Sequence, residues 1–193
     1  MRAVKRSRSV AIAVIVVVAA AWVGAQSRDL PEEFSAVAIA NDEFGSGAER
    51  VLIRVTRWST GAERERLVET LRTKGSRALL DELSDARSVG TIRTPDTLAY
   101  DLRYAHETRT PDGGRQIVLA TDRPIGFWEA ASNARTLDYP FAVIQMQFGP
   151  EGVGKGTLSY ATKIRAYGNI IELENFSISP ILLRDIRSTR DHE

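Results

Sequence analysis

Apolar and polar residues alternate with a period of two along much of this chain, a pattern typical of antiparallel strands with one buried face. The clearest example follows the glycine-rich stretch at 149–157. One side of this segment carries Leu158, Tyr160, Thr162, Ile164 and Ala166, and the other side carries Ser159, Lys163 and Arg165. We therefore expect a strand here and not a helix.

A turn at Gly168-Asn169 is predicted to fold this strand back onto residues 170–175, because both turn residues tolerate positive φ. The turn fixes one register, in which the facing residues are Tyr167 and Ile170, Arg165 and Glu172, Lys163 and Glu174, Ile164 and Leu173, and Ala166 and Ile171. Opposite charges then face each other on one side and apolar residues on the other. A slip by one residue would lose both sets, so the agreement predicts a hairpin.

The stretch 149–157, GPEGVGKGT, resembles the phosphate-binding loop of adenylate-kinase-type nucleotide kinases. Such a loop needs a helix directly after its lysine, here Lys155, so that backbone N–H groups and the helix N-terminus hold the phosphates. The alternation after Lys155 predicts a strand instead, and only 36 residues follow Thr157 for the rest of a kinase domain. We interpret the stretch as a turn between two strands, and this disfavours a nucleotide kinase.

The remaining elements follow the same period, with one helical interruption. Strands are expected at 34–40, 48–58, 89–93, 98–108, 116–121, 141–148 and 181–187. Thr60 and Glu63 form a capping-box pattern, which predicts a helix that runs to Lys74 and is closed by Gly75. A second short helix is expected from Ser76.

The turn at 111–114 predicts a second register. If Thr110 faces Arg115, then Arg103 faces Asp122, and Ala105 faces Ala120. Strict alternation along the strand at 98–108 would place five residues on one face: Leu98, Tyr100, Leu102, Tyr104 and His106.

The alternation stops between Asp122 and Tyr139, in a segment that carries Ile125, Phe127 and Trp128. We expect this segment to plug one end of a barrel or to cover a sheet, and the alternative is a lid over a ligand cavity. Together these elements predict a mainly β (α+β) fold. It is an antiparallel meander sheet of about nine strands, closed as a barrel or a sandwich, with a helical insertion at 60–85 after the second strand.

The first 25 residues have the composition of a general secretory signal peptide. Four basic residues precede an uncharged run from Val10 to Val23, and small residues end it before Gln26. We expect cleavage there and a periplasmic or extracellular protein with no stable membrane span; the alternative is an uncleaved membrane anchor. The rest divides into a flexible mature N-terminus at 26–33, a single domain at 34–187 and a frayed C-terminus at 188–193.

Charge and cysteine content exclude or disfavour several classes of function. Beyond residue 25 the chain has 22 basic and 25 acidic side chains, which disfavours nucleic acid or an anionic membrane as a dedicated partner. No cysteine is present, which excludes disulfides, thiol catalysis and cysteine-bound metals.

No catalytic motif is present, and we predict no catalytic set, no cofactor and no metal site. The nearest constellation is Asp101, His106 and Glu107, but alternation places both acids on the face opposite His106. Aromatic side chains with a polar edge are better suited to contacting a ligand. The candidates for lining a ligand site are Tyr100, Tyr104, His106, Phe127, Trp128 and Tyr160.

Several phrases taken together resemble a family of exported bacterial proteins that has no assigned activity. These phrases are 71–75 (LRTKG), 92–95 (IRTP), 100–104 (YDLRY), 117–124 (IVLATDRP), 126–130 (GFWEA) and 171–176 (IELENF). The resemblance extends from about Val51 to Arg187 and implies export and a single domain. It implies no functional residues.

These observations favour an exported, non-catalytic domain. We expect it to bind a small apolar or amphipathic ligand or an envelope protein. The alternative is a hydrolase or isomerase that uses His106 with a carboxylate from another strand.

Overall fold

The computed structural model describes residues 13–16, 31–42, 45–125, 138–168, 170–175 and 180–189. Within these residues there are eleven strands and one helix. The strands are β1 (Ala13–Val16), β2 (Glu32–Asp42), β3 (Gly45–Val55), β4 (Gly90–Arg93), β5 (Tyr100–Leu102), β6 (Tyr104–Arg109), β7 (Arg115–Ala120), β8 (Phe141–Phe148), β9 (Gly154–Tyr167), β10 (Ile170–Asn175) and β11 (Ile181–Ser188). The helix is α1 (Gly61–Asp85).

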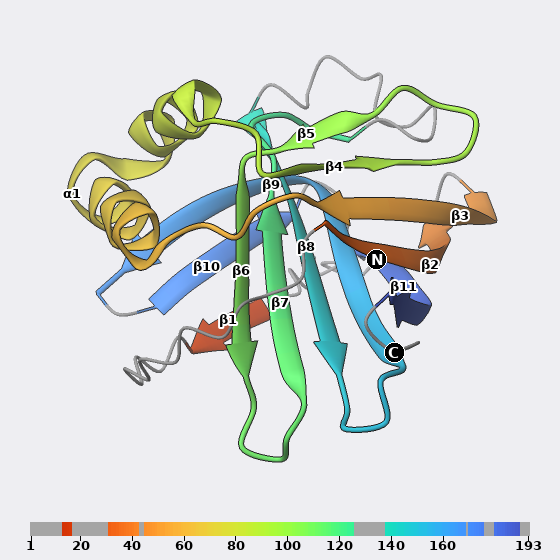
Figure 1. The fold of residues 1–193 in the computed structure, drawn as a ribbon. Coiled ribbons are helices and arrows are strands. Elements are labelled where there is room, and N and C mark those ends of the chain that lie inside the picture. The colour runs from red at the N-terminus through yellow and green to blue at the C-terminus, as the bar shows by residue number, and fades with distance from the viewer. Residues whose placement is uncertain are drawn as a thin grey trace, which may run out of the picture.

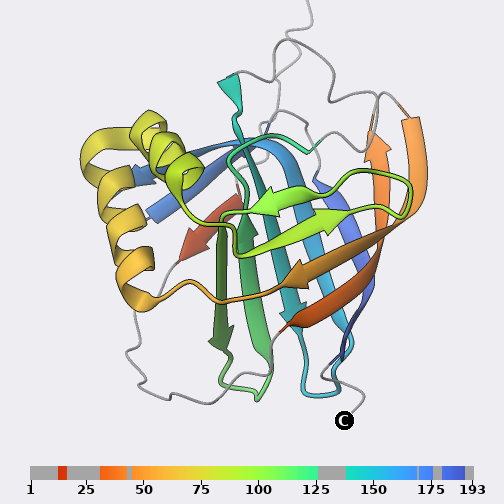
Figure 2. The same ribbon diagram turned by 45° about the horizontal axis from the view of Figure 1, so that its top comes forward.

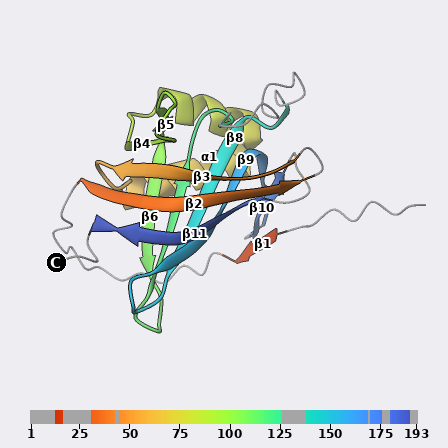
Figure 3. The ribbon, with the colours of Figure 1, turned by 90° about the vertical axis from the view of Figure 1, so that its right-hand side faces the viewer.

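Nine antiparallel strands form a nearly closed barrel in the order β5-β4-β3-β2-β11-β9-β8-β7-β6 (Figure 1). The two ends of this path, β5 and β6, are consecutive in the chain and are separated only by Arg103. Strands β2, β3 and β11 run side by side and cross β6, β7 and β8 steeply (Figure 3). The predicted antiparallel β fold of about nine strands, with a helix after the second strand of the barrel, is confirmed.

The last strand, β11, inserts between β9 and β2 and so joins two runs of consecutive strands. Strand β9 is long enough to serve two partners: its residues 154–158 pair with β11, and its residues 162–167 pair with β10. The predicted meander, in which consecutive strands are neighbours, is therefore interrupted once, where β11 lies between β2 and β9. This insertion places β11 beside β2, although the two strands lie at opposite ends of the sequence.

The hairpin of β9 and β10 has the predicted register throughout, from Tyr167 facing Ile170 to Lys163 facing Glu174. The side chains nevertheless pair differently. Arg165 reaches diagonally to Glu174, with 2.9 Å between Nη2 and Oε2. The Lys163 ammonium lies 4.5 Å from the centre of the Tyr139 ring.

Strand β1 pairs antiparallel with β10, from Ala13 facing Leu173 to Val16 facing Ile170. These residues belong to the segment that the sequence assigns to an export signal. The signal stays a prediction. In the full chain, residues 13–16 extend the sheet at the edge of β10 (Figure 3).

Helix α1 has the predicted cap and the predicted break. The Thr60 hydroxyl accepts a hydrogen bond from the Glu63 amide at 3.2 Å, and the Glu63 carboxylate accepts one from the Thr60 amide at 2.7 Å. Gly75 leaves the helical conformation with φ 83° and ψ −175°, so the helix consists of two segments. The Thr70 hydroxyl donates to Glu82 across this break at 2.5 Å, which holds the two segments together.

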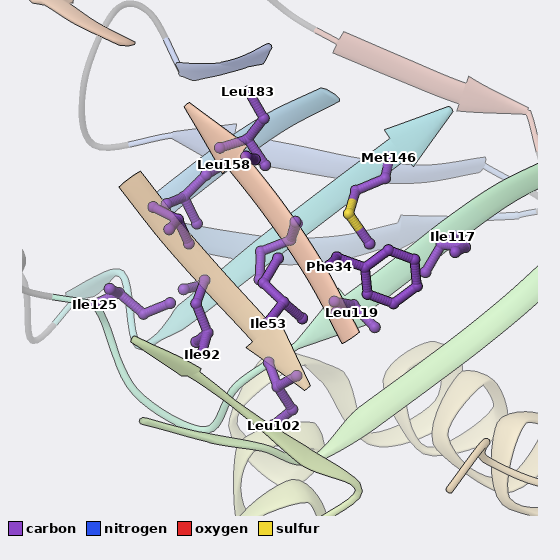
Figure 4. Packing of buried hydrophobic residues seen from close by; sticks show 14 of the residues in the cluster. Phe34, Ile53, Ile92, Leu102, Ile117, Leu119, Ile125, Met146, Leu158 and Leu183 are labelled. Carbon is purple, nitrogen blue, oxygen red and sulfur yellow. The ribbon is translucent and has the colours of Figure 1, made fainter. Parts of the chain in front are cut away.

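The sheet has a hydrophobic layer on each side. Inside the barrel, buried side chains from strands of both crossing halves pack together, including Phe34, Ile53, Leu119, Met146 and Leu183 (Figure 4). Outside it, leucines of α1 pack on β8, β9 and β10, so the helix covers that flank of the barrel (Figures 1 and 2). This second cluster consists of Leu71, Leu79, Leu83, Ala120, Phe141, Val143, Ile164 and Leu173.

The register predicted around the 111–114 turn is wrong by one residue. Thr110 faces Gly114 and not Arg115, because the turn has three residues and Gly113 takes a φ of 85° that suits glycine. Ala105 consequently faces Leu119. Arg103 still reaches Asp122, at 3.3 Å.

The predicted single strand at 98–108 is also wrong, because it breaks at Arg103, where the chain leaves β4 and begins to pair with β7. The break reverses the alternation. Leu102 lies in the inner core, whereas Tyr104 packs against the outer cluster. The prediction that five residues of this segment share one face is therefore wrong as well.

Candidate functional site

The ligand-lining candidates divide between the two sides of the sheet. Tyr160 is buried in the inner core, and Tyr100 packs against that core. Tyr104 lies on the outer side, where its ring stacks on His106 with 6.2 Å between the ring centres. Phe127 and Trp128 lie outside the described residues. The structure brings Tyr104 and His106 together and separates them from Tyr160.

Burial raises the pKa of the Tyr104 hydroxyl to about 12, with the Arg64 guanidinium opposing the shift. This phenol therefore stays protonated at neutral pH and cannot serve as a general base beside His106. Glu107 lies on the other face of β6, where it is buried. The predicted separation of His106 from Glu107 is confirmed. The prediction that Asp101 also lies opposite His106 is wrong, because the break at Arg103 reverses the alternation and turns Asp101 to the outward side.

The interior of the barrel is filled over the part of the chain that the structure describes. Ten labelled side chains from eight strands and from the segment after β7 meet there (Figure 4). Ile125, the first apolar residue of the irregular segment, is one of them, and its amide donates to the Tyr160 carbonyl at 3.0 Å. Ile125 is therefore part of the core, whereas residues 126–137 of the segment lie outside the described residues, so the plug stays a prediction.

One end of the barrel holds a buried group of charges. The Glu32 carboxylate is completely buried and lies 2.6 Å from Nη1 of Arg115. The Ser188 hydroxyl donates to the same carboxylate at 2.6 Å, and Glu107 lies 3.7 Å from Arg115. The Arg115 guanidinium also lies 4.4 Å from the centre of the Phe148 ring. These contacts tie the start of β2 to β7 and β11.

Sequence reasoning missed this group because Glu32 falls in the polar segment at 26–33, for which we expected a flexible terminus. Strand β2 begins at Glu32, two residues before the predicted strand, and this first residue points inward. Ser188 likewise lies just beyond the predicted end of the domain, yet it is buried at the end of β11.

The outer face of β11, β2, β3 and β4 is rich in arginine. Alternation turns the buried residues of these strands inward and leaves the others in cross-strand rows on the outside. One row joins Arg184, Val37 and Arg50, and the next joins Arg187, Ser35, Leu52 and Arg93. A third row joins Glu33, Arg54 and Thr91. We call this surface the arginine face and define it by Arg50, Arg54, Arg93, Arg184 and Arg187, all of which are exposed.

Aliphatic side chains accompany these arginines. Val37 is 37% exposed, Ile39 is 36% exposed and Leu182 is 39% exposed, and Ile39 and Leu182 face each other across β2 and β11. Positions of this kind are normally polar on the solvent side of an antiparallel sheet. The arginine face therefore combines positive charge with exposed apolar surface.

The arginine face contains a hollow of about 390 Å³. Arg54, Arg93 and Arg187 line it together with Leu52 and Ser35. The one carboxylate among its lining residues is that of Glu33, which lies 3.5 Å from Arg54; both side chains are 56% exposed. Three guanidinium groups around one carboxylate give the hollow an excess of positive charge. Such a site suits an anionic group.

Other functional classes find less support in the described residues. Lys155 lies in β9, facing Gln147 of β8, and the turn before it closes with a hydrogen bond from the Gly152 amide to the Gly149 carbonyl at 3.2 Å. A strand thus stands where a phosphate-binding loop needs a helix. No cluster of three or more histidine, aspartate or glutamate side chains suitable for a metal ion occurs in the described ranges. In those same ranges, no helix has the length and apolar character to cross a membrane.

The arginine face is not apparent from the local sequence, since its arginines come from three strands, β3, β4 and β11, that are spread over the chain. The sequence feature that could have indicated this face is the repeated arginine at outward positions of strands whose alternate residues are buried. It became informative only when β11 was placed beside β2. No family model, no curated protein and no solved structure matches this chain.

Proposed function

We propose that this protein is an exported, non-catalytic binding domain whose ligand is a small anionic amphiphile held in the hollow of the arginine face. The observation that carries the proposal is the meeting of Arg54, Arg93 and Arg187 around a hollow that also contacts Leu52. Ligand sites for small molecules have volumes of about 300–1,000 Å³, and this hollow lies within that range.

The charged end of the ligand would contact the guanidinium groups, which bind carboxylate and phosphate oxygens through paired N–H donors. The apolar end would follow the outward side of β2 from Ser35 towards Ile39. These two residues are separated by about 13 Å along an extended strand. Leu52 and Val37 provide apolar contacts on the way.

The packed interior argues for the outside of the barrel as the binding surface. A ligand inside would have to displace buried side chains such as Phe34 and Met146, and core packing of this density leaves few voids. Of the stacked pair, Tyr104 packs against the cluster beneath α1, and no carboxylate of β6 shares the face of the pair. We therefore place the ligand on the arginine face.

The test is calorimetric titration of the full chain with decyl phosphate, decanoate, decanol and decyltrimethylammonium below their aggregation concentrations. We expect the two anionic probes to bind at least about tenfold more tightly than the neutral and cationic probes, because each charged hydrogen bond contributes about 1.5–3 kcal/mol. Replacement of Arg54, Arg93 and Arg187 by Gln should remove this preference.

The matched control replaces Arg72, Lys74 and Arg77 of α1 by Gln, which removes the same charge from exposed positions outside the arginine face. This control should bind the four probes with the same affinities as the unchanged protein. Equal affinity for decanol and decyl phosphate, or unchanged binding after the triple replacement in the hollow, would contradict the proposal.

A further inference from the structure

We infer that the arginine face docks on an anionic lipid surface, with the tip of the β4–β5 hairpin inserted among the lipids. This inference rests on the proposed function, because it uses the same face and names the surface from which the amphiphile is taken. Its tests change Leu98, Arg50 and Arg184, which do not line the hollow. The two ideas can therefore be tested separately.

The first observation is the local charge. The arginine face has five exposed arginines, and Lys155 extends it on the outward side of β9. The acids on or beside it are Glu33, Asp96, Asp101 and Asp185, and Asp101 faces Thr91 at the edge of the face. Basic residues thus exceed acidic ones here by two, whereas residues 26–193 as a whole have three more acidic than basic side chains. The molecule is polarised, and an anionic surface would orient it with this face inward.

The second observation is Leu98, which is 90% exposed in the turn between β4 and β5. A leucine this exposed gains nothing from the folded protein, whereas insertion among acyl chains would remove it from water. The other exposed aliphatic residues of the face are Val37, Ile39 and Leu182. Ile39 and Val37 lie in the second half of β2, and Ile39 faces Leu182 near the start of β11.

The pairing of the strands brings these features to one side of the molecule. Arg93 at the end of β4 faces Leu52 of β3, so the turn that follows Arg93 extends along β3 towards the level of Arg50. Arg50 in turn faces Val37, which faces Arg184. The β4–β5 hairpin accordingly projects to the same side as the ends of β2 and β3 (Figures 1 and 2).

An anionic bilayer fits this arrangement better than an acidic protein segment. A peptide would need a groove or an open strand edge along its path. The arginine face instead lies on paired strands, and its basic and apolar groups are spread across four of them, over about 14 Å. Headgroups next to acyl chains present the complementary chemistry over an area of that width.

The test is co-sedimentation of the full chain with vesicles of phosphatidylglycerol and phosphatidylcholine, and with vesicles of phosphatidylcholine alone. We expect binding to the anionic vesicles, at least tenfold weaker binding to the neutral ones, and loss of binding at high salt. The Leu98→Glu variant, and separately the Arg50→Gln/Arg184→Gln variant, should each bind the anionic vesicles at least tenfold more weakly.

Val153→Glu is the matched control, since Val153 is 54% exposed on the β8–β9 turn and does not belong to the arginine face. It should bind as the unchanged chain does. If Leu98→Glu and the double arginine variant sediment like the unchanged chain, the N-terminal apolar segment or another surface holds the vesicles, and the inference is wrong. Absence of vesicle binding, with a concentration-dependent dimer that Leu98→Glu disrupts, would assign the face to a second copy and equally overturn it.

The same variants separate this inference from the proposed function. Leu98→Glu should leave the affinity for monomeric decyl phosphate unchanged, because Leu98 does not line the hollow. If decyl phosphate binds and vesicles do not, the ligand site stands and the docking fails. If vesicles bind and decyl phosphate does not, the docking stands and the ligand site fails.

Discussion

The carboxylate of Glu32 and the guanidinium of Arg115 form an ion pair 2.6 Å long, and none of the Glu32 side chain is exposed to solvent. Arg115 is 14% exposed, and its guanidinium lies over the ring of Phe148. Charges in such surroundings are stable only as long as each keeps its partner. The pair joins residues that are 83 positions apart, and it fixes the start of β2 against the opposite half of the barrel.

Replacement of Arg115 by Met should therefore destabilise the protein strongly. It would leave the Glu32 carboxylate buried without its cation, which costs about 3–5 kcal/mol in comparable pairs. The measurement is the free energy of unfolding from urea titration at neutral pH. Arg115→Lys should lower the free energy of unfolding less, because it keeps the positive charge. It should still lower it, because the planar group over Phe148 is lost.

The exposed pair of Arg54 and Glu33 is the control for this prediction. Its members lie 3.5 Å apart and are each 56% exposed, so Arg54→Met should change the free energy of unfolding by less than about 1 kcal/mol. If Arg115→Met and Arg54→Met lowered the free energy of unfolding by similar amounts, burial would not increase the contribution of the Glu32–Arg115 pair to stability, and the prediction would be wrong.

The sequence predicted those parts of the fold that depend on neighbouring residues. The β9–β10 register could be predicted because charges on one face and apolar residues on the other agreed on a single alignment. The β6–β7 register could not, because the contact between Arg103 and Asp122 forms although the pairing is shifted by one residue. One ion pair that tolerates a shift is weak evidence for a register, since charged side chains are long enough to reach diagonally.

The candidate site was harder to predict, for a reason of topology. The arginine face exists because β11 pairs with β2, and no pattern within either strand specifies the other as its neighbour. Glu32 and Arg115 meet for the same kind of reason. The aromatic residues that alternation placed on one face were separated by the break at Arg103, which appears only when the chain changes its partner strand.

The export signal has a direct test. We expect the chain, when produced in a bacterium and recovered from outside the cytoplasm, to begin at Gln26, because small residues at 23–25 suit cleavage after Ala25. Intact mass measurement decides this. Ala25→Trp should block cleavage, and recovery of the full 193 residues from the unchanged chain would support a retained anchor instead.

The cap of α1 should make stability depend on acid pH. The hydrogen bond from Arg57 at 3.0 Å and the one from the Thr60 amide lower the pKa of Glu63 to about 2 from its ordinary value of 4.5. Because the folded state favours the ionised carboxylate, this contribution to stability is complete above pH 4.5 and is lost as the pH falls towards 2.

The measurement compares the free energy of unfolding of the unchanged protein and of Glu63→Gln across this pH range. Gln keeps the capping hydrogen bonds and removes only the charge. The difference between the two proteins should be present at neutral pH and shrink below pH 4.5. Glu65→Gln, at an exposed position of the same helix, is the control, and a difference for Glu63 that stays constant with pH would refute the assignment.

The glycine-rich stretch at 149–157 offers the sharpest contrast between structural and functional explanations. A methyl group at Gly156 would lie 2.2 Å from the Gln145 carbonyl oxygen of the paired strand β8, whereas one at Gly149 would meet nothing within 4 Å. Gly156→Ala should therefore cost on the order of 1–3 kcal/mol of unfolding free energy, as overpacking does, while Gly149→Ala should change it by less than about 0.5 kcal/mol. Thermal and urea unfolding of the two variants measure this. If the glycines served to bind phosphate, the two variants would have similar free energies of unfolding and would differ in nucleotide affinity. If the two variants instead differ in stability and neither they nor the unchanged chain bind nucleotide, Gly156 is required for close strand pairing.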